Sequence, residues 1–117
     1  MTFRMGIFLA DLNPVIGSEQ KGRRPVLVIS DEDFNQVIPV VTILPITSLK
    51  KGRPLYPNEV LIPKGTAGLT ADSIILCHQI RTISKDRMIQ FSGTVKPQRY
   101  RMRYMRLCGL ILAFNAQ

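Results

Sequence analysis

The sequence predicts a mainly β protein: a small antiparallel barrel or curved sheet with short helices and a C-terminal helix packed across it. Three observations lead to this fold class. Segments rich in valine, isoleucine and threonine recur in the first two thirds of the chain, glycine and proline separate them, and apolar residues take helical spacing after Pro97. Because repeats and linkers are absent, the chain is expected to form one domain, 1–117.

Six segments are predicted as strands. They are 5–12, 25–30, 39–47, 58–63, 73–84 and 88–95. The first three carry apolar side chains on both faces, which is typical of strands covered on both sides. The fifth is long enough to bend midway, and the sixth has the weakest pattern. Loops with glycine and proline are expected at 49–57 and 63–72.

Two segments are predicted as helical. The segment 31–37 begins with acids after Ser30, a pattern that caps a short helical turn. Pro97 suits a first helical position, and apolar residues from Tyr100 to Phe114 then follow helical spacing. The stretch "RYRMRYMR" also alternates like a strand, but the length of the pattern favours a helix.

The charge balance indicates a polyanionic partner. Sixteen Lys and Arg residues stand against eight Asp and Glu residues, which gives a formal net charge of +8. Phosphate backbones favour such a chain because each contact releases a condensed counterion. RNA, DNA and an acidic protein all fit, and solubility alone is the simpler interpretation.

The sequence predicts neither a membrane segment nor a metal site. The apolar run 5–10 is too short for a signal peptide, and the longest uncharged stretch, 34–49, contains two prolines and is too short to span a bilayer. Cys77, Cys108 and His78 match no zinc or redox spacing. We therefore expect a cytoplasmic protein that uses no metal and no cofactor.

The stretch "GSEQKGRRPVLVIS" at 17–30 points to an anion site. A loop at 11–24 is long for a compact domain, and such loops are usually functional or disordered. Pro25 disfavours helical backbone for Arg24, so Arg24 is expected to be extended where the loop meets a strand. A guanidinium offers five donors in a planar fork that fits phosphate. The alternative is a surface arginine paired with Glu19.

Three ordered blocks carry a family resemblance: "GSEQKGRRPVLVIS", "LPITS" at 44–48 and "GLTADSIILCHQIRTISKDRM" at 68–88. In this order and spacing, residues 6–95 resemble the MazF/PemK (Kid-like) toxins of type II toxin–antitoxin systems. The resemblance implies an SH3-like barrel, a homodimer and a metal-independent endoribonuclease that cuts single-stranded RNA at short sequences. It also implies a cognate antitoxin that lays an extended acidic segment over the active groove.

The resemblance also assigns roles to particular residues. Arg24, directly before the strand proline, matches the catalytic arginine of the family, and Thr47 matches its catalytic threonine or serine. The expected substrate-binding residues are Glu19, Gln20, Lys50, Lys51, Gln79 and Arg81. The two lysines belong to this set because they follow Thr47 directly, although a solvated loop explains them equally well.

The chemistry of RNA cleavage suits these residue types. The 2′-hydroxyl next to the scissile phosphate serves as the nucleophile, which leaves a 2′,3′-cyclic phosphate and a 5′-hydroxyl. Positioned donors stabilise the dianionic phosphorane, each by about 3–4 kcal/mol, and Arg24 and Thr47 are such donors. Because a guanidinium is a poor base, Glu19 and substrate-bound water both remain open as the proton acceptor.

Two functions without catalysis remain as alternatives. Toxins that inhibit gyrase resemble this fold, and a basic module of the same shape can bind RNA without cutting it. The arginine-rich segment 99–106 either widens an RNA footprint or faces solvent. His78 shares a predicted strand face with apolar neighbours and is interpreted as a packed structural residue.

Overall fold

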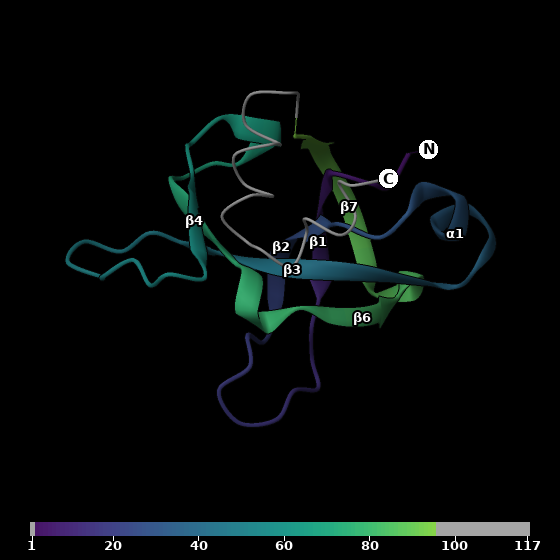
Figure 1. Cartoon of the computed structure of the whole chain (residues 1–117), viewed down its shortest axis with the longest axis horizontal. Helices are drawn as coiled ribbons and strands as arrows, with labels where there is room; N and C mark the ends of the chain where they lie inside the picture. Colours follow the sequence, from purple (N-terminus) through teal and green to yellow (C-terminus); the bar gives the residue numbers. More distant parts are fainter. Residues whose placement is uncertain (1, 96–117) are drawn as a thin grey trace.

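Seven strands form one antiparallel sheet in residues 2–95, the part of the chain that the computed structural model describes (Figure 1). The strands are β1 (Gly6–Asp11), β2 (Arg23–Val28), β3 (Val40–Ser48), β4 (Glu59–Ile62), β5 (Ser73–Leu76), β6 (Arg81–Ser84) and β7 (Met88–Thr94). Their order is β4-β5-β3-β2-β1-β7, and β6 pairs with β3 beside this path. The prediction of a mainly β, antiparallel fold is confirmed.

Four short helices connect the strands of the described part. They are the α-helix α1 (Glu32–Val37) and the 3₁₀ helices η1 (Thr66–Gly68), η2 (Cys77–Gln79) and η3 (Lys85–Arg87). η2 produces the predicted bend of the segment 73–84, and Asp31 caps α1 by accepting the Asp33 N–H at 2.8 Å. None of these helices is long and apolar enough to cross a membrane.

The predicted C-terminal helix after Pro97 lies outside the described residues. The assignment of residues 1–117 to a single domain stays a prediction. Residues 2–95 contain every residue that the sequence predicts for the site.

β3 is the central strand, because it changes partners along its length. It pairs with β2 through residues 43–45, with β6 through 40–43 and with β5 through 46–48. Pro45 has no N–H for the ladder and lies between the segments that bind β6 and β5. Figure 1 shows β3 running across the molecule with β6 alongside, so one strand joins the two parts of the sheet.

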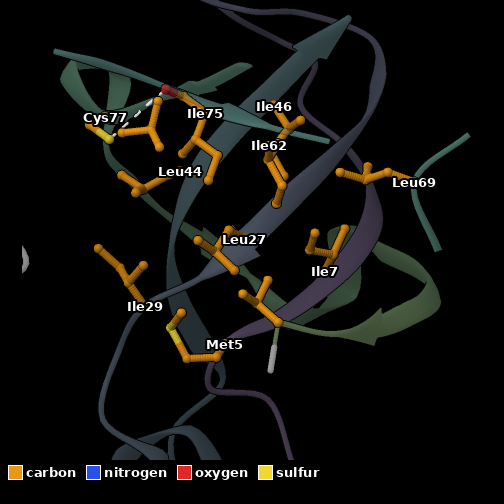
Figure 2. Packing of buried hydrophobic residues seen from close by; sticks show 12 residues of the cluster. Met5, Ile7, Leu27, Ile29, Leu44, Ile46, Ile62, Leu69, Ile75 and Cys77 are labelled. Atoms are coloured by element: carbon orange, nitrogen blue, oxygen red, sulfur yellow. Dashed lines mark hydrogen bonds between the residues drawn. The ribbon is translucent and has the colours of Figure 1, made fainter. Parts of the chain in front are cut away.

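Buried side chains cover both faces of the sheet. One cluster includes Leu27, Leu44 and Ile46, and Figure 2 shows its side chains pointing toward one another between the strands. The other cluster includes Val26 and Ile43. Because successive residues of a strand point to opposite faces, the neighbours 26 and 27 fall in different clusters. The continuous apolar runs of the sequence therefore bury both faces of β2 and β3.

One carboxylate on α1 holds the segment before β1. Oε1 of Glu32 accepts the N–H of Arg4 at 2.8 Å and that of Phe3 at 3.0 Å, and Asn35 Nδ2 donates to it at 3.1 Å. Burial raises the pKa of this carboxyl, but the hydrogen bonds from Arg4, Asn35, Phe3 and Gln36 outweigh it and lower the pKa below its ordinary 4.5. Glu32 is therefore ionised at neutral pH.

Glu32→Gln is expected to lower the free energy of unfolding at neutral pH by about 1–2 kcal/mol, because a neutral amide accepts fewer and weaker hydrogen bonds. The folded-state pKa of Glu32 is lowered, so its stabilisation is present above 4.5 and is lost as pH falls through the folded-state value. Urea unfolding at neutral pH and at about pH 3 measures this change.

The control for this experiment is Asp86→Asn, because Asp86 is exposed and its carboxylate contacts no described residue. A gap between wild type and Glu32→Gln that stays equally large at the acidic pH would contradict the role given to the ionised carboxylate.

Candidate functional site

The pairing of β2 with β3 brings the two catalytic candidates together. Val26 lies opposite Pro45, and two residues further along each strand the same register sets Arg24 opposite Thr47. Nη1 of Arg24 lies 3.4 Å from Oγ1 of Thr47, across 23 residues of sequence. The two residues that the sequence predicts for catalysis are therefore in contact, at the polar end of a strand pair whose middle is buried.

β2 begins two residues earlier than predicted. The ladder with β1 already includes Arg23 and Arg24, so both arginines lie in the strand and the loop spans 12–22. Pro25 lies inside the strand rather than at its first position. The backbone of Arg24 is thus fixed by sheet pairing as well as by the proline that follows it.

A backbone carbonyl orients the Arg24 side chain. Its Nε donates to the carbonyl of Lys21 at 2.7 Å, while Nη1 makes the longer contact with Thr47. Nη2 has no hydrogen-bond partner among the described residues. Because Nε already donates to the Lys21 carbonyl, the N–H groups of Nη1 and Nη2 are the donors that remain for an anion.

The alternative pairing of Arg24 with Glu19 is not formed. The Glu19 carboxylate instead accepts the backbone N–H of Ile16 at 2.9 Å, within the exposed tip of the loop 12–22. Ile16 is 84% exposed, so this tip has little packing of its own. Glu19 is therefore exposed on this loop, and it is not what holds Arg24.

Two predicted substrate contacts hold the loop 12–22 to the rest of the protein. Oε1 of Gln79 accepts the N–H of Gln20 at 2.8 Å, and Arg81 donates to the carbonyl of Leu12 at 3.1 Å. Figure 1 shows this loop projecting from the lower end of β1 and β2. The roles of Gln20, Gln79 and Arg81 in binding RNA stay predictions, because the contacts of the protein show only what these residues do for the loop.

The second loop at the site, 49–58, carries Lys50 and Lys51 and projects at the left of Figure 1. Both lysines are exposed. An ion pair ties the middle of this loop to the first residue of β4, because Arg53 donates Nη1 and Nη2 to the two carboxylate oxygens of Glu59 at 2.7 and 2.8 Å. The two lysines thus lie between the end of β3 and the anchored Arg53, and their contact with substrate stays a prediction.

The Glu59 carboxylate is almost fully buried, with 2% of its side chain exposed. The hydrogen bonds from Arg53 lower the pKa of this carboxyl; burial opposes them, and the Tyr56 N–H at 3.1 Å and the nearby His78 support them. The same carboxylate raises the pKa of Arg53. The sequence contains a signal for this pair that the prediction missed: an acid beside the apolar run of β4 needs a buried partner.

The interpretation of His78 as a packed residue is wrong. The predicted strand ends at Leu76, and the 3₁₀ turn η2 follows, so the alternation that placed His78 on an apolar face stops before it. His78 is exposed. Cys77, its neighbour, is buried.

Four cationic residues lie within four positions of Arg24 or Thr47 in the sequence. Lys21, Arg23, Lys50 and Lys51 are all exposed, and none forms an ion pair with a carboxylate of the described residues. Their positive potential attracts a polyanion to this end of the sheet. The fold and the site together define a small basic β protein that presents an arginine and a hydroxyl to an anionic ligand.

The chain matches the family of PemK-like, MazF-like toxins of type II toxin–antitoxin systems over residues 3–109, a range that includes the whole site. It therefore belongs to this family. The resemblance of the three sequence blocks to MazF and PemK toxins is confirmed.

Relatives and solved structures agree with this membership. The chain is 42% identical over 88 residues to Endoribonuclease MazF of Staphylococcus saprophyticus (75% of this chain, 72% of that protein) and 44% identical over 86 residues to Endoribonuclease EndoA of Bacillus subtilis (73% and 72%). MazF from Deinococcus radiodurans superimposes with a TM-score of 0.72 at 28% identity, covering 94% of each chain. A mycobacterial endoribonuclease in complex with its cognate antitoxin shares the fold, with a TM-score of 0.69 at 20% identity over 97% of this chain and 93% of that chain.

Glu59→Gln is expected to lower the melting temperature at neutral pH and to speed tryptic cleavage after Lys50 and Lys51 several-fold, because a neutral amide cannot hold Arg53 in a bidentate ion pair. The pKa of Glu59 is lowered in the folded state, so this stabilisation is present above 4.5 and is lost as pH falls through the folded-state value. Thermal unfolding and timed digestion measure the two effects.

Glu32→Gln is the matched control for the digestion. It also removes a hydrogen-bonded carboxylate, but that carboxylate binds the segment before β1 instead of the loop 49–58. Equal cleavage of this loop in the two variants would show that Glu59 has only a global effect on stability.

Proposed function

We propose that this protein is a toxin endoribonuclease that cleaves single-stranded RNA, including mRNA, at short sequences without a metal, with Arg24 and Thr47 as its catalytic residues. Relatives at 42% and 44% identity are named as endoribonucleases, which supports the activity. The observation that carries the assignment of residues is the 3.4 Å contact between Arg24 Nη1 and Thr47 Oγ1.

The length of this contact suits a site that opens for a phosphate. At 3.4 Å the hydrogen bond between guanidinium and hydroxyl is weak, so a charged phosphate oxygen replaces it with a stronger, charge-assisted bond. The Lys21 carbonyl continues to hold Nε during this exchange. Arg24 therefore stays aimed at the site while its outer N–H groups change partners.

The reaction balances without an external nucleophile. The 2′-oxygen of the RNA attacks the neighbouring phosphorus, the bond to the 5′-oxygen breaks, and the products carry a 2′,3′-cyclic phosphate and a 5′-hydroxyl. One proton leaves the 2′-hydroxyl, and solvent water supplies one to the departing 5′-oxygen. Arg24 stabilises the negative charge on the phosphorane, Thr47 donates a hydrogen bond to one of its oxygens, and Glu19 or a bound water accepts the first proton.

The remaining predicted contacts divide between backbone and bases. Lys50 and Lys51 bind phosphates beyond the scissile one, because flexible ammonium groups reach a backbone without reading its sequence. Glu19 and Gln20 lie on the loop 12–22, and Gln79 accepts the N–H of Gln20. Carboxylate and amide groups such as theirs hydrogen-bond the edges of unpaired bases. Specificity then depends on the loop 12–22 and affinity on the loop 49–58.

The proposal includes a cognate antitoxin with an acidic segment, a homodimer and a cytoplasmic location. The family is that of type II toxin–antitoxin systems, and solved relatives include complexes named MazE–MazF. A net charge of +8 favours an acidic inhibitor over the same surface that binds RNA. The dimer rests on the resemblance to the family.

Arg24→Ala and Thr47→Ala are each expected to lower the cleavage rate of RNA by about a hundredfold or more, because each removes one donor to the transition state. The assay contains EDTA, and primer extension maps the cuts. Arg23→Ala controls for loss of charge beside Arg24, and Thr42→Ala, whose hydroxyl contacts only Thr82 among the described residues, controls for loss of a hydroxyl on β3.

Wild-type rates from folded Arg24→Ala and Thr47→Ala proteins would contradict the assignment of these residues. Intact RNA with the folded wild-type protein would contradict the enzyme itself. In that case, inhibition of DNA supercoiling by gyrase, or salt-dependent RNA binding without cleavage, identifies which of the two alternative functions holds.

A further inference from the structure

The loop 12–22 determines where the Arg24 guanidinium points. The Lys21 carbonyl that accepts Arg24 Nε is the last but one peptide group of this loop. A movement of the loop therefore moves the acceptor that orients the side chain. Whatever fixes the loop base thereby contributes to the geometry of the site.

The two ends of the loop are tied together by its own backbone. Leu12 N–H donates to the carbonyl of Gly22 at 2.9 Å, and the side chain of Asn13 accepts the N–H of Gly22 at 3.1 Å. These bonds close the base, but they do not attach it to the neighbouring part of the sheet.

Two arginines from the far end of the described chain attach the base. Arg81 donates Nη1 to the Leu12 carbonyl at 3.1 Å, and Arg87 donates Nη1 to the Asp11 carbonyl at 3.2 Å and also to the carbonyl of Asn13. Three successive backbone carbonyls thus accept from two guanidinium groups. The contacts span 69 to 76 residues of sequence, so they fix the loop to β6 and η3 rather than to its own neighbours.

Both arginines donate hydrogen bonds from a charged guanidinium to backbone carbonyls. Each side chain is half-buried, and neither forms an ion pair with a carboxylate of the described residues. A charged donor makes a stronger hydrogen bond to a carbonyl than a neutral one does. These two arginines therefore hold the first residues of the loop and make no hydrogen bond to its exposed tip around Ile16.

We propose that Arg87, together with Arg81, is a positioning residue that fixes the loop 12–22 so that the Lys21 carbonyl aims Arg24 at the scissile phosphate. This inference rests on the proposed function, because it acts through Arg24. In this proposal Arg87 acts through the loop and not on the substrate; Arg81 contacts the same loop, and its role as an RNA contact stays a prediction. Nothing in the sequence singles out Arg87, since its partners are backbone atoms of a distant loop.

A positioning role has a kinetic signature. Misplacing a catalytic group by about 1 Å costs on the order of a hundredfold in rate. Binding of the RNA phosphates to the other cationic side chains does not depend on this placement. Loss of Arg87 therefore lowers kcat and leaves KM unchanged. Because the effect passes through Arg24, it is absent when Arg24 is already missing.

The test compares Arg87→Met with Lys85→Met in steady-state cleavage of RNA, which yields kcat and KM. Lys85 lies in the same 3₁₀ turn as Arg87, and its substitution by Met removes the same charge. Its ammonium lies over the Phe3 ring, 4.9 Å from the centroid, whereas the guanidinium of Arg87 binds carbonyls at the base of the loop 12–22. We expect Arg87→Met to lower kcat about 10- to 100-fold at unchanged KM, and Lys85→Met to keep the wild-type kcat. Arg87→Lys, which retains a charged donor, gives an intermediate kcat.

Two further measurements separate positioning from a loss of folding. Trypsin cleaves faster after Lys21 in Arg87→Met than in Lys85→Met, while the melting temperatures show that both variants fold. The double variant Arg24→Ala/Arg87→Met cleaves no more slowly than Arg24→Ala alone.

A kcat for Arg87→Met equal to that of Lys85→Met would overturn the inference, and so would a higher KM at unchanged kcat, which identifies an RNA contact. If Arg24→Ala keeps wild-type activity, the proposed function fails instead. The tryptic comparison then still decides whether Arg87 anchors the loop.

Discussion

The register between β2 and β3 is the constraint on which the site depends. Val26 opposite Pro45 and Leu27 opposite Leu44 are buried pairs, and Val26, Leu27 and Leu44 belong to the clusters on the two faces of the sheet. A slip of one residue turns every side chain to the other face, so burial of these apolar residues enforces one alignment. That alignment places Arg24 against Thr47, and the hydrophobic core thereby determines the distance between two polar groups.

The loops divide the remaining tasks. Arg53 and Glu59 hold the loop 49–58 through an ion pair whose carboxylate is buried, and charged donors to backbone carbonyls hold the loop 12–22. Arginine side chains thus tie part of each loop to the sheet and leave other residues of the loop exposed. Such an arrangement keeps the reacting groups in place while the tips adapt to a ligand, which is how a rigid scaffold commonly carries variable binding loops.

The sequence predicts the strands well, because they depend on local patterns, and the two residues that it proposes for catalysis, Arg24 and Thr47, lie in contact. Apolar runs between glycines and prolines reveal the strands, and the motif around Pro25 identifies Arg24 by resemblance. The missed features depend on long-range contacts. The earlier start of β2 comes from pairing with β1, and the exposure of His78 comes from a 3₁₀ turn inside an apolar run. Arg87 binds carbonyls that lie 74 and 76 residues away in the sequence.

The central claim is that Arg24 and Thr47 act together on the scissile phosphate. A crystal structure with RNA that carries a 2′-deoxy nucleotide at the cleavage site tests it most directly, because this RNA binds but has no nucleophile. The account predicts Nη atoms of Arg24 and Oγ1 of Thr47 at about 3 Å from oxygens of that phosphate, with Nε still on the Lys21 carbonyl. A scissile phosphate bound elsewhere, with the Arg24–Thr47 contact intact, would contradict it.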